Sequence, residues 1–82
     1  MIDTMSSVAR VSVGSKSHVR FPDGKIRVIQ VVDTPQAVVP EKGIVSHESP
    51  LGQSLIGKKP GERARYSVGV SWIHIEVIAI EH

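Results

Sequence analysis

Apolar and polar residues alternate with a period of two along much of the chain, and this pattern predicts β-strands. In the first part of the sequence we expect strands over 8–13, 19–21 and 26–32, the last of which is rich in β-branched residues. Turn residues separate these segments at 14–15 and 22–24. The N-terminal part of the chain is therefore predicted to be a run of short strands.

The second part of the chain adds a loop and three more strands. The segment 33–43 contains two prolines and ends in glycine, which predicts a loop, and 44–46 is expected to be a short strand. Over 63–68 and again over 72–79, apolar residues alternate with polar ones, as in half-buried strands. Residues 69–71 predict a hairpin connection, and the arginines of the first of these two strands predict a basic outer face.

One short helix is predicted in the stretch that begins at Ser49. Ser49 suits the N-cap, and Pro50 suits the first helical position, where a missing N–H has no cost. Leu51 and Leu55 lie four residues apart and would face the sheet together, and Gly57 would end the helix in a left-handed conformation. Several strands with one short helix predict an α+β domain, in which a largely antiparallel sheet packs on the helix.

The same stretch contains the spacing G-x-x-x-x-G-K at Gly52, Gly57 and Lys58, which resembles a phosphate-binding P-loop. A P-loop lysine lies at the start of a long helix whose amides face the phosphates. Here Lys58 is followed closely by Pro60 and Gly61, which disfavour a helix. We therefore interpret the glycine spacing as the end of a helix and not as a nucleotide site.

The size and composition of the chain exclude several kinds of protein. Its 82 residues suffice for one small domain, and the absence of cysteine excludes disulfides and thiolate metal sites. No apolar run approaches the ~18 residues of a membrane span, so we expect a cytoplasmic domain without membrane contact. The charges, which sum to +2, are interspersed along the chain, and aromatic residues are few, so we expect nucleic acid to be at most a secondary partner. We expect the protein to be a monomer.

The polar side chains offer few candidates for catalysis or metal binding. His74 and Glu76 lie two residues apart on one strand face and could bind a metal if a third ligand came from another strand. Because the chain has no cysteine and no His-x-x-x-His pair, we interpret them as surface residues. Ser54 with His47 would act as nucleophile and base only if the fold brought them together. We therefore predict no catalytic residue, no metal site and no cofactor.

The sequence SPLGQSLIGKKPGE, residues 49–62, resembles the signature of the C-terminal domain of the bacterial GreA/GreB transcript-cleavage factors. In that family a strand leads into S-P-[IL]-[GA]-x-[AS]-L-[IL]-G-[KR], followed by a turn of the type x-x-G-[DE]. The segments VSVGSKSHVRF and IRVIQVVDT resemble the strands before this signature, and the segment after it resembles the closing hairpin. The resemblance covers residues 8–81, so we expect a linker over 1–7 and a GreA/GreB C-terminal-like domain over 8–82.

This resemblance implies an FKBP-like fold, in which an antiparallel sheet curls over one short helix. It also implies a role in transcription elongation, because the family domain docks on RNA polymerase at the rim of the secondary channel and contacts the coiled coil of the β′ subunit there. The family's catalytic help comes from an N-terminal helical hairpin, whose acidic tip holds a magnesium ion. A hairpin that reaches ~30 Å needs roughly 20 residues per helix, and only seven residues precede the first predicted strand. We therefore expect the chain to bind polymerase without being an enzyme.

The resemblance also suggests contact residues. The family uses the corner where a strand enters the helix to meet the β′ coiled coil, and this corner corresponds here to Glu48, Ser49 and Pro50. Ser49 and Pro50 would cap the helix in any case, so Glu48 is the residue that separates docking from capping.

A second candidate contact is the densest basic group of the chain, which contains Lys58, Lys59, Arg63 and Arg65. In one interpretation these residues form a solvated helix end and strand face, since cations are favoured at a helix C-terminus. In the other interpretation they contact an acidic surface of polymerase or nucleic acid.

Two other functions stay open for a chain of this fold. One is an FKBP-like peptidyl-prolyl isomerase, but such enzymes line their pocket with many aromatic side chains, and this chain has Phe21, Tyr66 and Trp72, far apart in sequence. The other is a regulator of a different enzyme, similar to the regulator of nucleoside diphosphate kinase. That regulator carries a short N-terminal helical region, which we do not expect in this chain. An isomerisation assay on a proline peptide would separate the first of these from polymerase docking.

Overall fold

The computed structural model describes residues 10–81. The linker expected over 1–7 and the start of the first predicted strand at Val8 lie outside the described residues. The described part contains five strands, one α-helix and two short 3-10 helices. In chain order these elements are β1 (Lys16–Arg20), β2 (Ile26–Val32), η2 (Pro35–Ala37), η3 (Pro40–Lys42), β3 (Ile44–Ser46), α1 (Pro50–Leu55), β4 (Arg63–Val68) and β5 (Ser71–Glu81).

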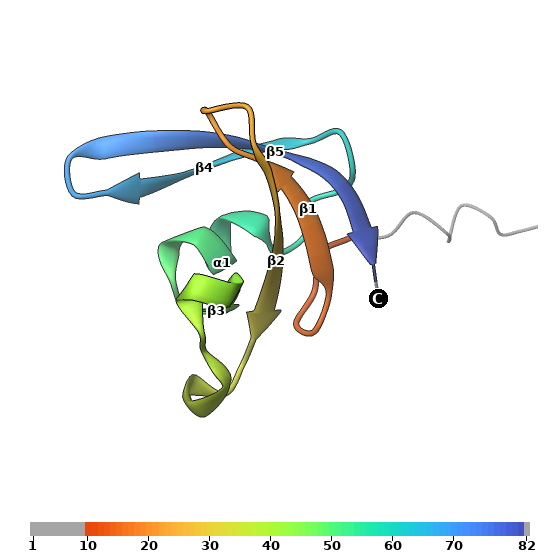
Figure 1. Ribbon diagram of the computed structural model, residues 1–82, viewed down its shortest axis with the longest axis vertical. Helices are drawn as coiled ribbons and strands as arrows, with labels where there is room; N and C mark the ends of the chain where they lie inside the picture. Colours follow the sequence, from red (N-terminus) through yellow and green to blue (C-terminus); the bar gives the residue numbers. More distant parts are fainter. Residues whose placement is uncertain (1–9, 82) are drawn as a thin grey trace, which may run out of the picture.

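The five strands form one mixed sheet in the order β3-β2-β1-β5-β4 (Figure 1). β1 pairs antiparallel with both β2 and β5, and β4 pairs antiparallel with β5. β3 lies parallel to β2, because the chain crosses back through the loop with η2 and η3 before it returns to the sheet. β3 and β4 are therefore the two edges of the described sheet.

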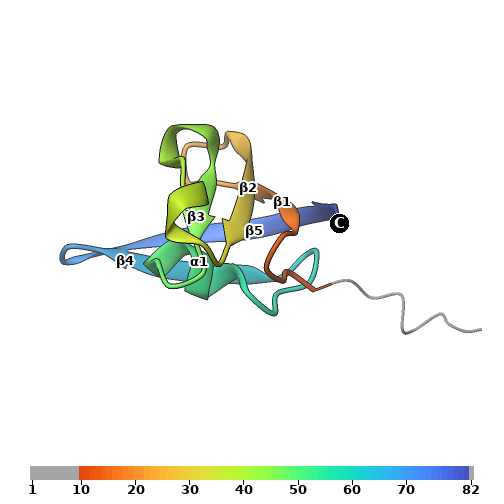
Figure 2. The same cartoon turned by 90° about the horizontal axis from the view of Figure 1, so that it is seen from below.

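The sheet curls around the helix. In Figure 2 the β4–β5 hairpin forms one layer and the strands β1, β2 and β3 rise steeply from it, while Figure 1 shows α1 in the angle between the hairpin and β2. The helix packs against both edge strands, mainly against β4 and also against β3. The α+β fold predicted from the sequence, a sheet curled over one short helix, is therefore confirmed.

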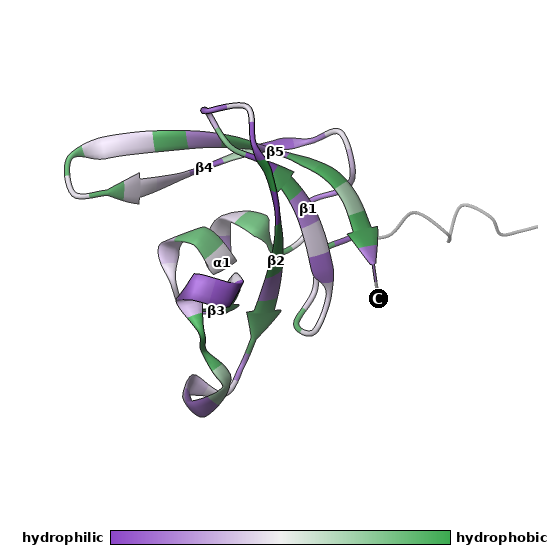
Figure 3. Ribbon diagram, viewed as in Figure 1, coloured by the Kyte–Doolittle hydropathy of each residue, from purple (hydrophilic) through white to green (hydrophobic). Residues whose placement is uncertain are grey.

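The hydrophobic core lies between α1 and the concave face of the sheet. Leu55 enters it from the helix, while Val19, Val31 and Val77 enter it from β1, β2 and β5, and all four are fully buried. Figure 3 shows hydrophobic residues in green on each of these elements, interrupted by hydrophilic ones. Such burial contributes ~2 kcal/mol per side chain and holds a helix that is too short to be stable alone. None of the helices within residues 10–81 is long and apolar enough to cross a membrane.

The strand bounds agree with the sequence pattern in most places. The strands predicted over 26–32, 44–46 and 63–68 have these bounds in the structure, and the last strand extends slightly beyond 72–79 at both ends. The strand predicted over 8–13 is wrong in its described part, because residues 10–15 form no strand.

Val11 explains this difference. It is buried, as the alternation requires, but its backbone bonds with the loop that follows α1. Its N–H donates to the Lys58 carbonyl at 2.9 Å, and its carbonyl accepts from the Gly57 N–H at 2.8 Å. Alternation of apolar residues indicates which side chains are buried, but it does not indicate which segment the backbone pairs with. The pattern therefore predicts a strand here, although the segment does not form one.

Candidate functional site

The corner between β3 and α1 contains the three residues that the sequence suggests for docking. Ser49 is the N-cap of α1, as predicted: its Oγ accepts a hydrogen bond from the Gly52 N–H at 3.0 Å and donates one to the Ser46 carbonyl at 2.6 Å. The Glu48 N–H donates to the Ser46 Oγ at 3.0 Å. These bonds tie the corner to Ser46, so its backbone is fixed before any partner binds.

Glu48 and Pro50 project from this fixed corner. Both residues are exposed, whereas Ser49 is half-buried. Pro50 occupies the first position of α1, as predicted, and its ring restricts the backbone there. The Glu48 carboxylate forms no hydrogen bond or ion pair with any of residues 10–81. An unpaired carboxylate on a rigid corner is available to a cationic partner.

The helix ends as the glycine spacing predicts. Gly57 has a φ of 86°, in the left-handed region that favours glycine. Residues 56–62 form turns and loop, so no helix begins at Lys58. This confirms that the P-loop-like spacing marks a helix end.

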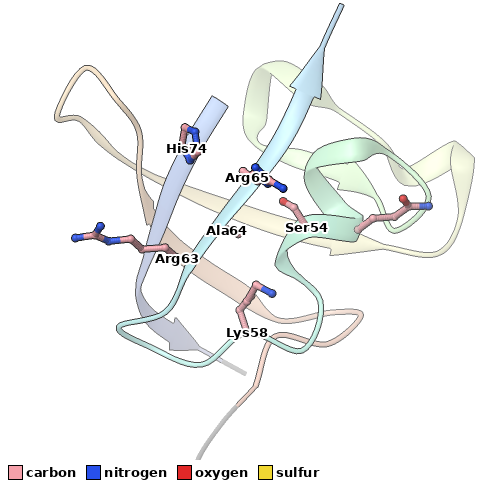
Figure 4. Close-up of a pocket in the computed structure, with 7 residues that line it drawn as sticks. Ser54, Lys58, Arg63, Ala64, Arg65 and His74 are labelled. Atoms are coloured by element: carbon pink, nitrogen blue, oxygen red, sulfur yellow. The ribbon is translucent and has the colours of Figure 1, made fainter. Parts of the chain in front are cut away.

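Three of the four predicted basic residues meet in an open depression of about 410 Å³ (Figure 4). Lys58 reaches it from the loop after α1, while Arg63 and Arg65 reach it from β4. In Figure 4 the Ser54 hydroxyl and the Arg65 side chain point toward one another, and Arg63 extends away from them. The other residues that line the depression are Gln53, Ala64 and His74.

Lys59, the fourth predicted basic residue, does not line this depression. Its backbone belongs to the turn before β4, where the Lys59 N–H donates to Oε1 of Glu62 at 2.8 Å. This hydrogen bond lowers the pKa of the exposed Glu62 carboxyl. The structure therefore divides the predicted basic group into a cluster of three side chains and a turn residue.

His74 and Trp72 are members of this surface that the sequence interpretation missed. His74 lies opposite Arg65 in the β4–β5 ladder, whereas the sequence interpretation weighed it as a metal ligand, assigned it to the surface and did not group it with the basic residues. Trp72 lies under the Arg65 guanidinium, which is 4.7 Å from the ring centroid. The observed turn consists of residues 69–70 and not of the predicted 69–71, and this shorter turn sets the register that brings His74 opposite Arg65. Counting back from the predicted turn would have placed a different residue there.

A second depression, of about 280 Å³, places the corner next to two aromatic residues. Pro50 lines it from α1, and Tyr66 and Trp72 line it from the hairpin. Partial burial raises the pKa of the Tyr66 hydroxyl. Phe21 instead packs against the core from the end of β1. Two of the three aromatic residues thus gather on one surface, although they are separate in the sequence.

The candidate metal and nucleophile residues are not assembled in the described part of the chain. No group of three or more His, Asp or Glu side chains among residues 10–81 is placed to hold a metal. Glu76 pairs instead with Arg20 at 3.3 Å. The Ser54 Oγ donates to the Leu51 carbonyl at 2.7 Å, while His47 lines a different depression near the C-terminal end of α1.

Comparison with known proteins points to one family. The family model "Transcription elongation factor, GreA/GreB, C-term" matches residues 6–82. The transcription elongation factor GreA of Treponema pallidum is 33% identical over 75 residues, which are 87% of this chain and 44% of that protein. An uncharacterized protein of Mycobacterium tuberculosis is 36% identical over 72 residues, which are 83% of this chain and 44% of that protein. The chain therefore spans less than half the length of these curated relatives.

Solved structures share the fold. Gfh1 of Thermus aquaticus superposes with a TM-score of 0.78 at 26% identity, over 93% of this chain and 50% of that one. The GreA factor homolog 1 (Gfh1) of Thermus thermophilus superposes with a TM-score of 0.77 over 100% of this chain and 55% of that one. At 24% identity the second likeness concerns the fold alone.

Proposed function

The chain belongs to the GreA/GreB family through the C-terminal domain of these factors, and we propose that it docks on bacterial RNA polymerase at the rim of the secondary channel, against the coiled coil of the β′ subunit. The observation that carries this function is the family match, which extends over residues 6–82 and so includes every described element. The FKBP-like α+β fold of the family domain agrees with the curled five-stranded sheet and its single short helix.

The corner of Glu48, Ser49 and Pro50 supports docking through its rigidity. Ser49 and Ser46 hold the backbone by hydrogen bonds, and Pro50 restricts it further, so little conformational entropy would be lost on binding. Glu48 offers a solvent-exposed charge that is not used by the fold. We propose that Glu48 contacts a cationic side chain of the β′ coiled coil, with Pro50 packing beside it.

The basic depression supports a secondary contact. Lys58, Arg63 and Arg65 share one surface next to the corner, because Gln53 and Ser54 line both depressions. We propose that an acidic surface of the polymerase lies against these cations once the corner has docked. Nucleic acid is the less favoured occupant, because only Trp72 and Tyr66 offer rings for stacking on this side.

The C-terminal domain of Gre factors is not itself catalytic. We therefore propose that this chain binds polymerase without supplying catalytic carboxylates to transcript cleavage. In a stalled elongation complex, its addition is expected to leave the rate of cleavage unchanged.

Polymerase binding can be tested with core RNA polymerase from the source bacterium and with the same enzyme lacking the tip of the β′ coiled coil. The chain is expected to bind the intact polymerase and to lose this binding when the tip is removed, as measured by calorimetry. No binding to the intact enzyme would contradict the proposed function. Equal binding to both enzymes would place the contact away from the coiled coil.

A further inference from the structure

β4 is an edge strand, and its pairing with β5 determines which of its backbone groups point to the free edge. The Val77 N–H donates to the Glu62 carbonyl at 2.9 Å just before β4 begins, and hydrogen-bonded pairs alternate along an antiparallel ladder. Counting the pairs from the two-residue hairpin turn, at the other end of β4, gives the same alternation of hydrogen-bonded and non-hydrogen-bonded pairs. The backbone N–H and C=O groups of Arg63, Arg65 and Ser67 therefore point away from β5, toward the free edge of the described sheet.

A groove runs along this free edge. It consists of the two depressions of about 410 and 280 Å³, which share Gln53, Ser54 and Arg65. β4 forms one bank of the groove and α1 forms the other. An extended chain that added to β4 along this open groove would satisfy the free backbone groups of the strand.

The charge of the groove selects the occupant. Lys58, Arg63, Arg65 and His74 line it, and none of its lining residues is Asp or Glu. The carboxylate opposite Arg63 in the ladder, Glu76, already pairs with Arg20. The groove therefore presents cations whose charge is not balanced by acids of the groove itself.

Among these cations, Arg65 lies over an aromatic ring. Its guanidinium lies 4.7 Å from the centroid of the Trp72 ring, and stacking of this kind leaves the N–H groups at its edge free to bind a carboxylate. A second copy of the chain is disfavoured as the added strand, because β4 paired with β4 would bring the arginines of both strands onto one face.

We propose that the free edge of β4 binds an extended acidic segment of a partner protein as an added sixth strand. Backbone groups of Arg63, Arg65 and Ser67 would pair with the segment, and carboxylates two residues apart on it would face the two arginine side chains. This surface adjoins the Glu48 corner, because Pro50 also lines the groove, and it narrows the acidic contact proposed above to one extended segment, whose chemistry does not depend on polymerase being the partner. It defines the ligand by its chemistry: an extended chain with acids at alternate positions.

The probe for this site is a capped heptapeptide, Thr-Glu-Val-Glu-Val-Glu-Thr, added to the full 82-residue chain and followed by NMR. The peptide is expected to bind, to shift the amide resonances of Arg63, Arg65 and Ser67, and to slow their hydrogen exchange. The same peptide with lysine in place of glutamate is expected not to bind. Failure of the acidic peptide to bind, or shifts confined to other strands, would overturn the proposal.

Two variants test the charge and the backbone separately. Arg65→Glu is expected to weaken binding of the acidic peptide at least tenfold, while Arg27→Glu, the same change at an exposed site on β2, is expected to change it less than twofold. Ser67→Pro removes a free-edge donor and is expected to weaken binding with all charges kept. If Ser67→Pro disturbs the fold, slower amide hydrogen exchange at Arg63, Arg65 and Ser67 of the unmodified chain in the presence of the peptide shows whether the backbone of β4 pairs with it.

Two further outcomes would overturn the proposal. One is unchanged affinity of Arg65→Glu for the acidic peptide. The other is that a single-stranded oligonucleotide with the same net charge as the peptide shifts the same amide resonances at a lower concentration. This result would assign the groove to nucleic acid.

Discussion

Gly52, in the first turn of α1, lies directly against the backbone carbonyl oxygen of Ser46, the last residue of β3. A β-carbon on Gly52 would overlap this oxygen. The same oxygen accepts hydrogen bonds from the N–H and the Oγ of Ser49. The end of the strand and the start of the helix are thus packed backbone to backbone, and the small residue of the S-P-L-G sequence is what allows it.

Gly52→Ala is expected to destabilise the domain by about 2 kcal/mol, because the new methyl group meets backbone that cannot move aside. This outcome opposes the helix propensity, by which alanine is better than glycine in a helix by about 1 kcal/mol. Urea unfolding followed by circular dichroism measures the change. Gln53→Ala, at the next and exposed position of α1, serves as the control and is expected to change stability by ~0.5 kcal/mol or less. Equal stability of Gly52→Ala and the unmodified chain would contradict the close packing.

The Glu81 carboxyl provides a test at acidic pH. Its pKa lies below the ordinary value of 4.5, first because His18 donates a hydrogen bond to it at 2.7 Å and then because of the charge of His18. A carboxyl whose pKa is lowered by folding stabilises the native state above its unfolded pKa, and this contribution is lost as the pH falls through the folded value. His18→Ala is expected to raise the pKa of Glu81 toward 4.5, as measured by NMR titration of the side-chain carboxyl carbons.

Glu62 is the internal control for this titration. Its pKa is lowered mainly by a hydrogen bond from the Lys59 backbone N–H, which a change at His18 leaves in place. The pKa of Glu62 is therefore expected to stay low in His18→Ala. An unchanged pKa of Glu81 in this variant would mean that the pair with His18 does not form in solution.

The sequence predicts local structure well because the residues that determine it are neighbours in the chain. Ser49, Pro50 and Gly57 mark the start and end of α1 through their own backbone preferences, and the structure confirms all three roles. The β-branched run of β2 likewise predicts its bounds. The segment near Val11 was predicted wrongly because its backbone partner, the loop at 57–58, is remote in sequence.

The candidate surface was predicted in part for the same reason. Lys58, Arg63 and Arg65 could be grouped from the sequence because they are close along the chain, but their meeting with Ser54 and His74 depends on how β4 pairs and on how α1 packs beside it. Pro50, Tyr66 and Trp72 line one depression only because the fold brings their elements together. Register and helix packing are tertiary properties, and no period in the sequence reports them.

Glu48→Lys is the sharpest test of the docking corner. The Glu48 side chain is exposed, and only its backbone N–H, bonded to the Ser46 Oγ, takes part in the corner. The substitution is therefore expected to change stability by ~0.5 kcal/mol or less. If the corner docks on the β′ coiled coil, the reversed charge is expected to weaken binding by well over ~1 kcal/mol, a factor of about five or more in Kd.

A matched variant separates this local effect from a change of net charge. Glu41→Lys makes the same charge change at an exposed residue of η3, away from the corner in sequence, and is expected to keep the affinity of the unmodified chain. Calorimetry with an isolated β′ coiled-coil fragment measures all three proteins under one salt concentration, because charge contacts weaken as salt rises. Equal affinity of Glu48→Lys and Glu41→Lys would remove Glu48 from the contact, since the capping bonds of Ser49 are present in both and only the carboxylate at the corner differs.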